Sequence, residues 1–113
     1  MDKIVRYRDL IKMLLTQYTE LAVRQPQKGV ETFLLFDEER DQYMWVKSGW
    51  SQKHRIYGVT LHIRLYDEKI WVEQDWTEDG IATDLVNAGV PYEDIVLAFC
   101  EPELREMTEF AVA

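Results

Sequence analysis

The stretch RIYGVTLHIRLYDEKIWVEQD, residues 55–75, predicts two successive β-strands. Apolar side chains occupy alternate positions in its first half, which is the period of a β-strand with one buried face. The tripeptide DEK at 67–69 makes a tight turn, and IWVEQD at 70–75 continues as a second strand, so the two strands are expected to pair antiparallel. In the first strand, one face is expected to carry Tyr57, Val59, Leu61, Ile63 and Leu65, and the opposite face Thr60, His62 and Arg64.

Two more strands precede this hairpin. VETFLLF at 30–36 and YMWVKSGW at 43–50 are typical of strands, and the charged segment DEERDQ at 37–42 predicts a turn between them. SQKH at 51–54 predicts the next turn. Because every connection is short, the four strands are expected to form an antiparallel meander with one face packed against helices.

An amphipathic helix is predicted from about residue 2 to residue 23. Asp2 is a suitable cap at its start, and Pro26 and Gly29 in RQPQKG end it. The predicted fold class is therefore α+β. The apolar stripe of this helix, with spacings of three and four residues, consists of Ile4, Tyr7, Ile11, Leu14, Tyr18 and Leu21.

A second helix is predicted where WTEDGIATDLVNAG follows the fourth strand. Asp75 followed by Glu78 resembles a capping box, with Thr77 as the other candidate cap. Glu78 and Asp79 are expected in the first turn, where the helix dipole favours acids, and Gly89 ends the helix. The apolar face consists of Ile81, Leu85 and Val86. Glu73 and Asp84 are left without a structural role.

The C-terminal quarter is less defined by its pattern. Residues 95–99, IVLAF, fit either a buried strand or a short helix, because periodicity cannot separate the two in so short a run. The terminal FAVA, residues 110–113, is expected to dock on the domain or on a second copy of it.

Length and composition predict one domain spanning residues 1–113. The single cysteine, Cys100, excludes an internal disulfide, and no apolar run approaches the roughly 20 residues of a membrane span, which together predict a cytoplasmic protein. The net charge of -8 is uneven: residues 1–57 hold 10 basic and 8 acidic side chains, residues 58–113 hold 3 and 13. The acidic half favours a basic protein partner over nucleic acid.

Neither a metal site nor a cofactor is expected. His54 and His62 lie on different predicted elements, and Cys100 has no histidine near it in sequence. Two alternatives stay open. A metal-dependent nuclease would use the turn acids Asp67 and Glu68 with Lys69 and Asp41, and a direct DNA-binding module would use Lys47, Lys53, His54 and Arg55.

The motifs SGW (48–50), RIYGVTLHI (55–63), KIWVEQD (69–75), DIVLAF (94–99) and the terminal FAVA resemble the XisI family of small cyanobacterial proteins. The resemblance implies a non-catalytic factor that controls excision of the fdxN DNA element together with an XisH-like protein partner. The chain departs from the family pattern at Trp76, where a small residue is usual, and at Cys100, where histidine is common. We expect partner contact at Glu73, Asp75, Trp76, Glu78 and Asp79, and self-association is a further possibility.

Overall fold

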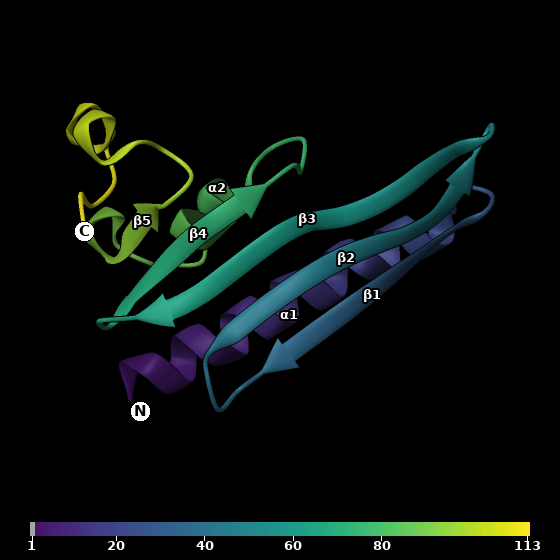
Figure 1. Ribbon diagram of the computed structural model, residues 1–113. Helices are drawn as coiled ribbons and strands as arrows, with labels where there is room; N and C mark the ends of the chain where they lie inside the picture. Colours follow the sequence, from purple (N-terminus) through teal and green to yellow (C-terminus); the bar gives the residue numbers. More distant parts are fainter. Residues whose placement is uncertain (1) are drawn as a thin grey trace.

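A five-stranded sheet in the order β1-β2-β3-β4-β5 forms the centre of the structure (Figure 1). The computed structural model describes residues 2–113. The predicted α+β class and four-stranded antiparallel meander are confirmed, and a short fifth strand parallel to β4 extends the sheet. In chain order the elements are α1 (Lys3–Arg24), β1 (Val30–Asp37), β2 (Gln42–Ser51), β3 (His54–Tyr66), β4 (Lys69–Asp75), α2 (Ile81–Asn87), η1 (Tyr92–Asp94), β5 (Ile95–Leu97) and η2 (Pro102–Met107).

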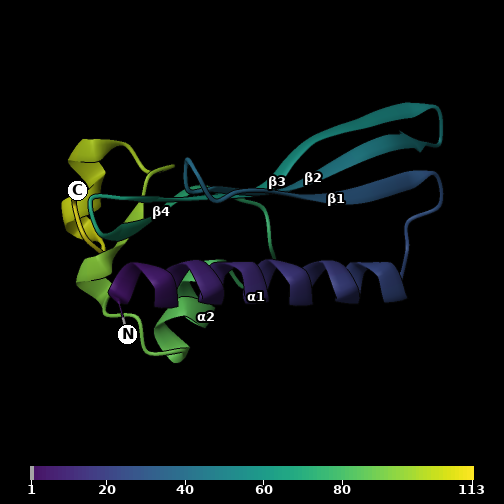
Figure 2. The ribbon, with the colours of Figure 1, turned by 90° about the horizontal axis from the view of Figure 1, so that it is seen from below.

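Both α-helices lie on the same face of the sheet, which leaves the other face free of helices (Figure 2). We call these the helix face and the outer face. The hydrophobic core lies between the helix face and the helices, and its fully buried members include Ile11, Leu15, Leu61, Ile63 and Leu85. Within residues 2–113, neither helix is long and apolar enough to cross a membrane.

Helix α1 follows the prediction closely. The Asp2 carboxylate accepts the Ile4 backbone N–H at 3.3 Å, as expected of a cap, and Tyr7, Ile11 and Leu14 are buried. The predicted stripe is wrong at its end, because Leu21 is 59% exposed. The β2–β3 hairpin bends away from α1 at this end (Figure 2), so the sheet does not cover the last helical turns there.

Two-residue turns join the central strands. Gln52 and Lys53 between β2 and β3, and Asp67 and Glu68 between β3 and β4, all have positive φ angles between 48° and 67°. This backbone conformation matches the right-handed twist of the paired strands, and it confirms both predicted turns.

A β-bulge reverses the predicted faces of β3 in its first half. Trp45 pairs with Leu61, but the next residue of β2, Val46, pairs with Val59, so Thr60 is the extra residue. One added residue moves every side chain before it to the other face. Leu61 is therefore buried as predicted, whereas Tyr57 is 72% exposed. The prediction that Tyr57 and Val59 share one face of the strand with Leu61 is wrong.

The C-terminal residues close one edge of the sheet. Residues 95–97 form β5 beside β4, which resolves the open alternative in favour of a strand. The Ala111 N–H donates to the Ile95 carbonyl at 2.8 Å, and Phe110 packs against the core, so FAVA docks on its own domain. Phe99 lies beyond the strand and is 54% exposed.

Candidate partner-binding site

The loop between β4 and α2 is organised by one carboxylate. Oδ1 of Asp75 accepts the Thr77 N–H at 2.8 Å, and Oδ2 accepts the Ile81 N–H at 2.7 Å. Asp75 thus satisfies the first amide of α2 from outside the helix. The predicted capping box is wrong, because α2 begins at Ile81, after Gly80, and Glu78 lies in the loop.

Glu78 and Asp79 are consequently outside the first helical turn, contrary to the prediction. The one acid in that turn is Asp84. Both Glu78 and Asp79 are exposed, and neither takes part in an ion pair among residues 2–113. Their charges are therefore free for contact with another molecule.

These two acids line a groove of about 460 Å³. The loop after β4 forms one wall, the end of α1 forms another, and β2 and β3 form the floor. Leu21, left exposed by the bend of the hairpin, is part of this surface. The lining consists of Tyr18, Leu21, Ala22, Gln25, Trp45, Lys47, Thr60, Trp76, Thr77, Glu78, Asp79, Gly80 and Asp84.

Acids outnumber bases around the groove. Glu78, Asp79 and Asp84 face a single cation, Lys47, whose Nζ lies 5.5 Å from the Trp45 ring centroid. Asp84 accepts a hydrogen bond from the Tyr18 hydroxyl, and burial together with this bond raises the pKa of Tyr18 well above its usual value. Tyr18 therefore keeps its proton and remains the hydrogen-bond donor to Asp84.

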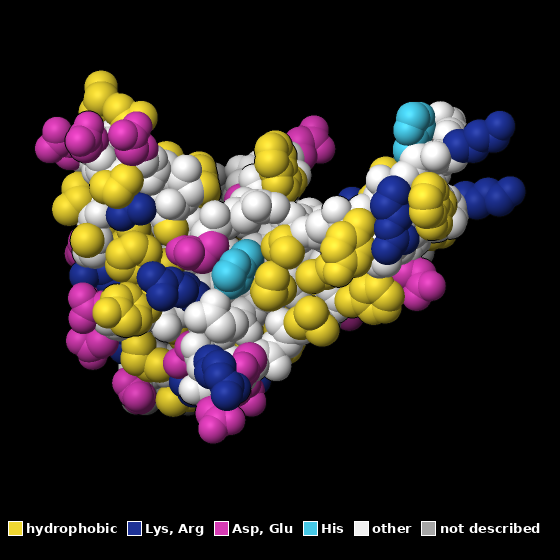
Figure 3. Space-filling view, in the orientation of Figure 1, with side chains coloured by type: hydrophobic (Ala, Val, Ile, Leu, Met, Phe, Trp, Pro, Cys, Tyr) yellow, Lys and Arg dark blue, Asp and Glu magenta, His cyan; other side chains and the backbone are white. Residues whose placement is uncertain are grey.

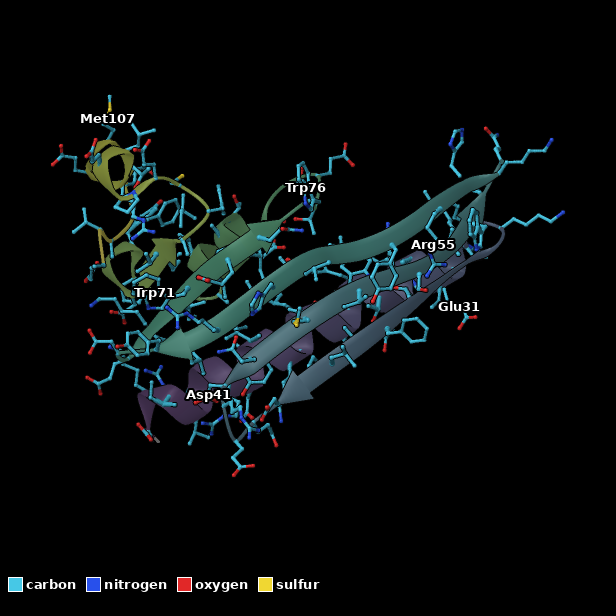
Figure 4. All side chains as sticks on the ribbon, viewed as in Figure 1. Glu31, Asp41, Arg55, Trp71, Trp76 and Met107 are labelled. Carbon is cyan, nitrogen blue, oxygen red and sulfur yellow. The ribbon has the colours of Figure 1, made fainter. Side chains whose placement is uncertain are left out.

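Trp76 projects beside the groove and is 77% exposed (Figure 4). Its backbone N–H donates to the Thr60 carbonyl at 2.9 Å. Thr60 is the bulged residue of β3, so the irregularity that turns Tyr57 outward also holds the backbone of Trp76. An exposed indole beside carboxylates suits a cationic or mixed apolar–basic segment of a protein.

Glu73 lies apart from the groove, on the outer face. Its Oε2 is 3.7 Å from Nε of Arg64, and neither of these buried atoms has a hydrogen-bond partner within residues 2–113. The Arg64 guanidinium also lies over the rings of Tyr66 and Trp71, at 4.8 and 5.1 Å from their centroids. Glu73 therefore has a structural partner that the sequence did not reveal.

The five predicted contact residues thus separate into three roles. Trp76, Glu78 and Asp79 line the groove, Asp75 builds the loop, and Glu73 pairs on the other face. Sequence reasoning missed Tyr18, Lys47 and Asp84 as groove residues. No local signal identifies them, because α1, β2 and α2 bring them together from distant parts of the chain.

Of the acids of the nuclease alternative, Asp41 has structural partners outside that set. Asp67 and Glu68 occupy the β3–β4 turn, with the Asp67 carboxylate 4.0 Å from Lys69 Nζ. Asp41 accepts hydrogen bonds from Arg8 Nε at 2.9 Å and from the Tyr43 hydroxyl at 2.8 Å. Among residues 2–113, no group of three or more His, Cys, Asp or Glu side chains is placed to hold a metal.

The basic residues of the DNA-binding alternative are divided between two places. Lys53, His54 and Arg55 lie at the tip of the β2–β3 hairpin, where Figure 4 labels Arg55, whereas Lys47 belongs to the groove. The Arg55 guanidinium lies 5.7 Å from the Trp50 ring centroid and donates to the Gly49 carbonyl at 3.2 Å. Basic side chains gather at this tip in the space-filling view (Figure 3).

A meander sheet covered on one face by an N-terminal helix defines a class of small α+β proteins with known members. The XisI-like protein of Anabaena variabilis is 41% identical, with a TM-score of 0.89 over 96% of this chain and 98% of its own. The fdxN element excision controlling factor XisI of Anabaena variabilis is 38% identical, with a TM-score of 0.87 over 99% of this chain and 100% of its own. Curated proteins provide no match.

The family model described as XisI protein matches residues 1–112, and the chain belongs to the XisI family.

Proposed function

We propose that the chain is a non-catalytic accessory factor that controls excision of a DNA element through protein contacts. The structurally similar XisI of Anabaena variabilis is named as a controlling factor of fdxN element excision, which supports this role. The partner proposed is an XisH-like protein, expected from the family resemblance. In this proposal, the partner presents a basic segment to the groove beside α2.

One observation carries the proposal: Trp76, Glu78 and Asp79 are exposed together at a groove and serve no packing or capping function. Large exposed aromatic side chains next to charges are typical of interface anchors. Unpaired carboxylates also attract a basic partner over a distance of about 10 Å at 0.1 M salt.

The test is the affinity of the purified chain for its XisH-like companion at increasing salt. We expect the double substitution Glu78→Gln with Asp79→Asn to weaken binding at low salt and to flatten its salt dependence. Glu103→Gln with Glu106→Gln removes the same charge from η2, where both acids are exposed and neither forms an ion pair among residues 2–113, and is the matched control. Equal affinity for both double variants would contradict the proposal.

A second candidate, direct contact with nucleic acid, is supported by the hairpin tip. The Arg55 guanidinium lies beside the exposed rings of Trp50 and Tyr57, which are 59% and 72% exposed, and Lys53 occupies the adjacent turn. Positive charge and exposed aromatics are the features on which single strands stack. Loss of oligonucleotide binding in Lys53→Glu with Arg55→Glu, with retention in Glu78→Gln with Asp79→Asn, would support this candidate.

A further inference from the structure

One edge of the sheet is covered by the C-terminal residues, and the other edge is uncovered within residues 2–113. At the β5 edge, Ala111 forms a parallel bridge to Val96, so the C-terminal residues cover the strand. At the other edge, β1 has β2 as its one neighbour in the sheet order (Figure 1). β1 is eight residues long, and VETFLLFD contains no proline or lysine that would discourage pairing.

The ladder between β1 and β2 identifies which backbone groups of β1 are free. Trp50 N–H donates to the Gly29 carbonyl at 2.9 Å, so Gly29 and Trp50 form a hydrogen-bonded pair. Because such pairs alternate in an antiparallel ladder, Glu31, Phe33 and Leu35 direct their N–H and C=O groups to β2. The backbone groups of Thr32, Leu34 and Phe36 therefore point away from the sheet.

The local geometry at the start of β1 agrees with this alternation. By the same alternation, the backbone groups of Val30 point away from β2. Its N–H donates to the Gln27 carbonyl at 3.1 Å instead of to β2. The free ladder thus consists of three residues, Thr32, Leu34 and Phe36, with Leu34 in the middle.

We propose that β1 pairs antiparallel with β1 of a second copy of this chain, with Leu34 on the two-fold axis. Leu34 then faces its own counterpart, and Thr32 and Phe36 face each other on both sides, so all three outward residues exchange hydrogen bonds. The unpaired backbone N–H and C=O groups of Thr32, Leu34 and Phe36 are arranged symmetrically about Leu34. They can therefore pair with the same groups of a second copy, as a two-fold interface requires.

Side chains on the outer face support the same register. Phe33 is 42% exposed and Leu35 is 55% exposed in the single chain. With Leu34 on the axis, Phe33 of each copy lies opposite Leu35 of the other, which is a favourable cross-strand pair. In the space-filling view, hydrophobic side chains gather on this face over β1–β3 (Figure 3), and pairing would extend that surface across two copies.

Charges at the ends of β1 favour the antiparallel direction. Lys28 precedes the strand, and Glu38 and Glu39 follow it. With Leu34 on the axis, Lys28 of one copy lies level with Arg40 of the other and one position from Glu39, whereas parallel pairing would place Lys28 beside Lys28 and the two acidic turns together. Glu31 would face Asp37 of the second copy, where Arg40 already lies 3.1 Å from the Asp37 carboxylate and neutralises it.

The test compares three full-length proteins by sedimentation equilibrium, with circular dichroism as the check on folding. We expect the unmodified chain to dimerise. Phe33→Lys with Leu35→Lys places lysines opposite each other and should raise the dimer Kd at least tenfold. Phe33→Lys with Leu35→Glu keeps the same two sites polar but pairs opposite charges across the axis, so it should restore much of the dimer.

Each remaining result would overturn the proposal. A monomeric unmodified chain at 100 μM would show that the second copy is not the occupant of the edge, including the case in which an XisH-like partner protects β1 instead. A dimer unaffected by the two lysines would place the interface elsewhere. Equal disruption by both variants would contradict the register.

Discussion

The carboxylate of Asp75 lies 2.7 Å from the backbone nitrogen of Ile81 and thereby connects the end of β4 to the start of α2. Within the same acidic loop, Glu78 and Asp79 are exposed, and neither carboxylate accepts a backbone N–H from the part of the chain that the structure describes. The acidic segment after β4 therefore combines one carboxylate that builds the fold with two that are free to meet a partner.

Replacing Asp75 by alanine should lower the free energy of unfolding by about 1–3 kcal/mol, because two half-buried backbone N–H groups would lose their acceptor. Urea denaturation followed by circular dichroism measures the change. Glu78→Ala and Asp79→Ala are the matched controls, and each should change stability by less than about 0.5 kcal/mol. Equal losses in all three variants would contradict this division of roles.

Replacing Tyr18 by phenylalanine should cost about 1–2 kcal/mol of stability, because Asp84 loses the hydroxyl that donates to it. The cost is limited because Asp84 lines the groove and water can replace the donor. Thermal unfolding at neutral pH checks the effect. A variant as stable as the parent would show that the bond between α1 and α2 contributes nothing.

High pH should destabilise the fold through three tyrosines. Burial is the main factor that raises the pKa of Tyr7, Tyr18 and Tyr43 above the usual value of 10, and hydrogen bonds to Asp94, Asp84 and Asp41 add to it. Above pH 10 the unfolded chain loses these protons while the folded chain keeps them, so stability falls as pH rises.

Urea unfolding between pH 9 and pH 11 tests this dependence, together with tyrosinate absorbance. The expected result is that three of the six tyrosines ionise only with unfolding. Ionisation of all six in the folded protein near pH 10 would be inconsistent with the buried hydroxyls.

His62 should titrate below 6.5 in the folded protein. Burial on the sheet lowers its pKa, and the nearby Glu73 carboxylate partly offsets this effect. Since the unfolded chain takes up a proton first, stability should fall as pH drops below about 6.5. Proton NMR of the imidazole gives the midpoint, and Glu73→Gln should lower it further. A midpoint above 6.5 would contradict the burial argument.

The elements that follow from local pattern were predictable from sequence. The stripe from Tyr7 to Leu14 gave α1, and the alternation of Leu61, Ile63 and Leu65 gave the second half of β3. The turn at residues 67–68 was also predictable. A two-residue connection between two strands favours the positive φ angles that Asp67 and Glu68 adopt.

Features that depend on distant parts of the chain were not predictable. The bulge at Thr60 leaves no mark on the alternating pattern, yet it turns Tyr57 outward and supplies the carbonyl that holds Trp76. Residues 95–97 form a strand because their backbone pairs with the edge of β4. The groove needs α1 beside the acidic loop, so the part played by Lys47 emerged only from the fold.

We propose Trp76, Glu78 and Asp79 as the surface that meets the partner protein. The most direct measurement is a 15N NMR titration of the labelled chain with its unlabelled XisH-like companion at low salt. We expect the largest changes at the Trp76 indole and at the amides of residues 77–80. Changes confined to the hairpin tip at residues 52–55, or to β1, with the acidic loop unperturbed, would contradict it.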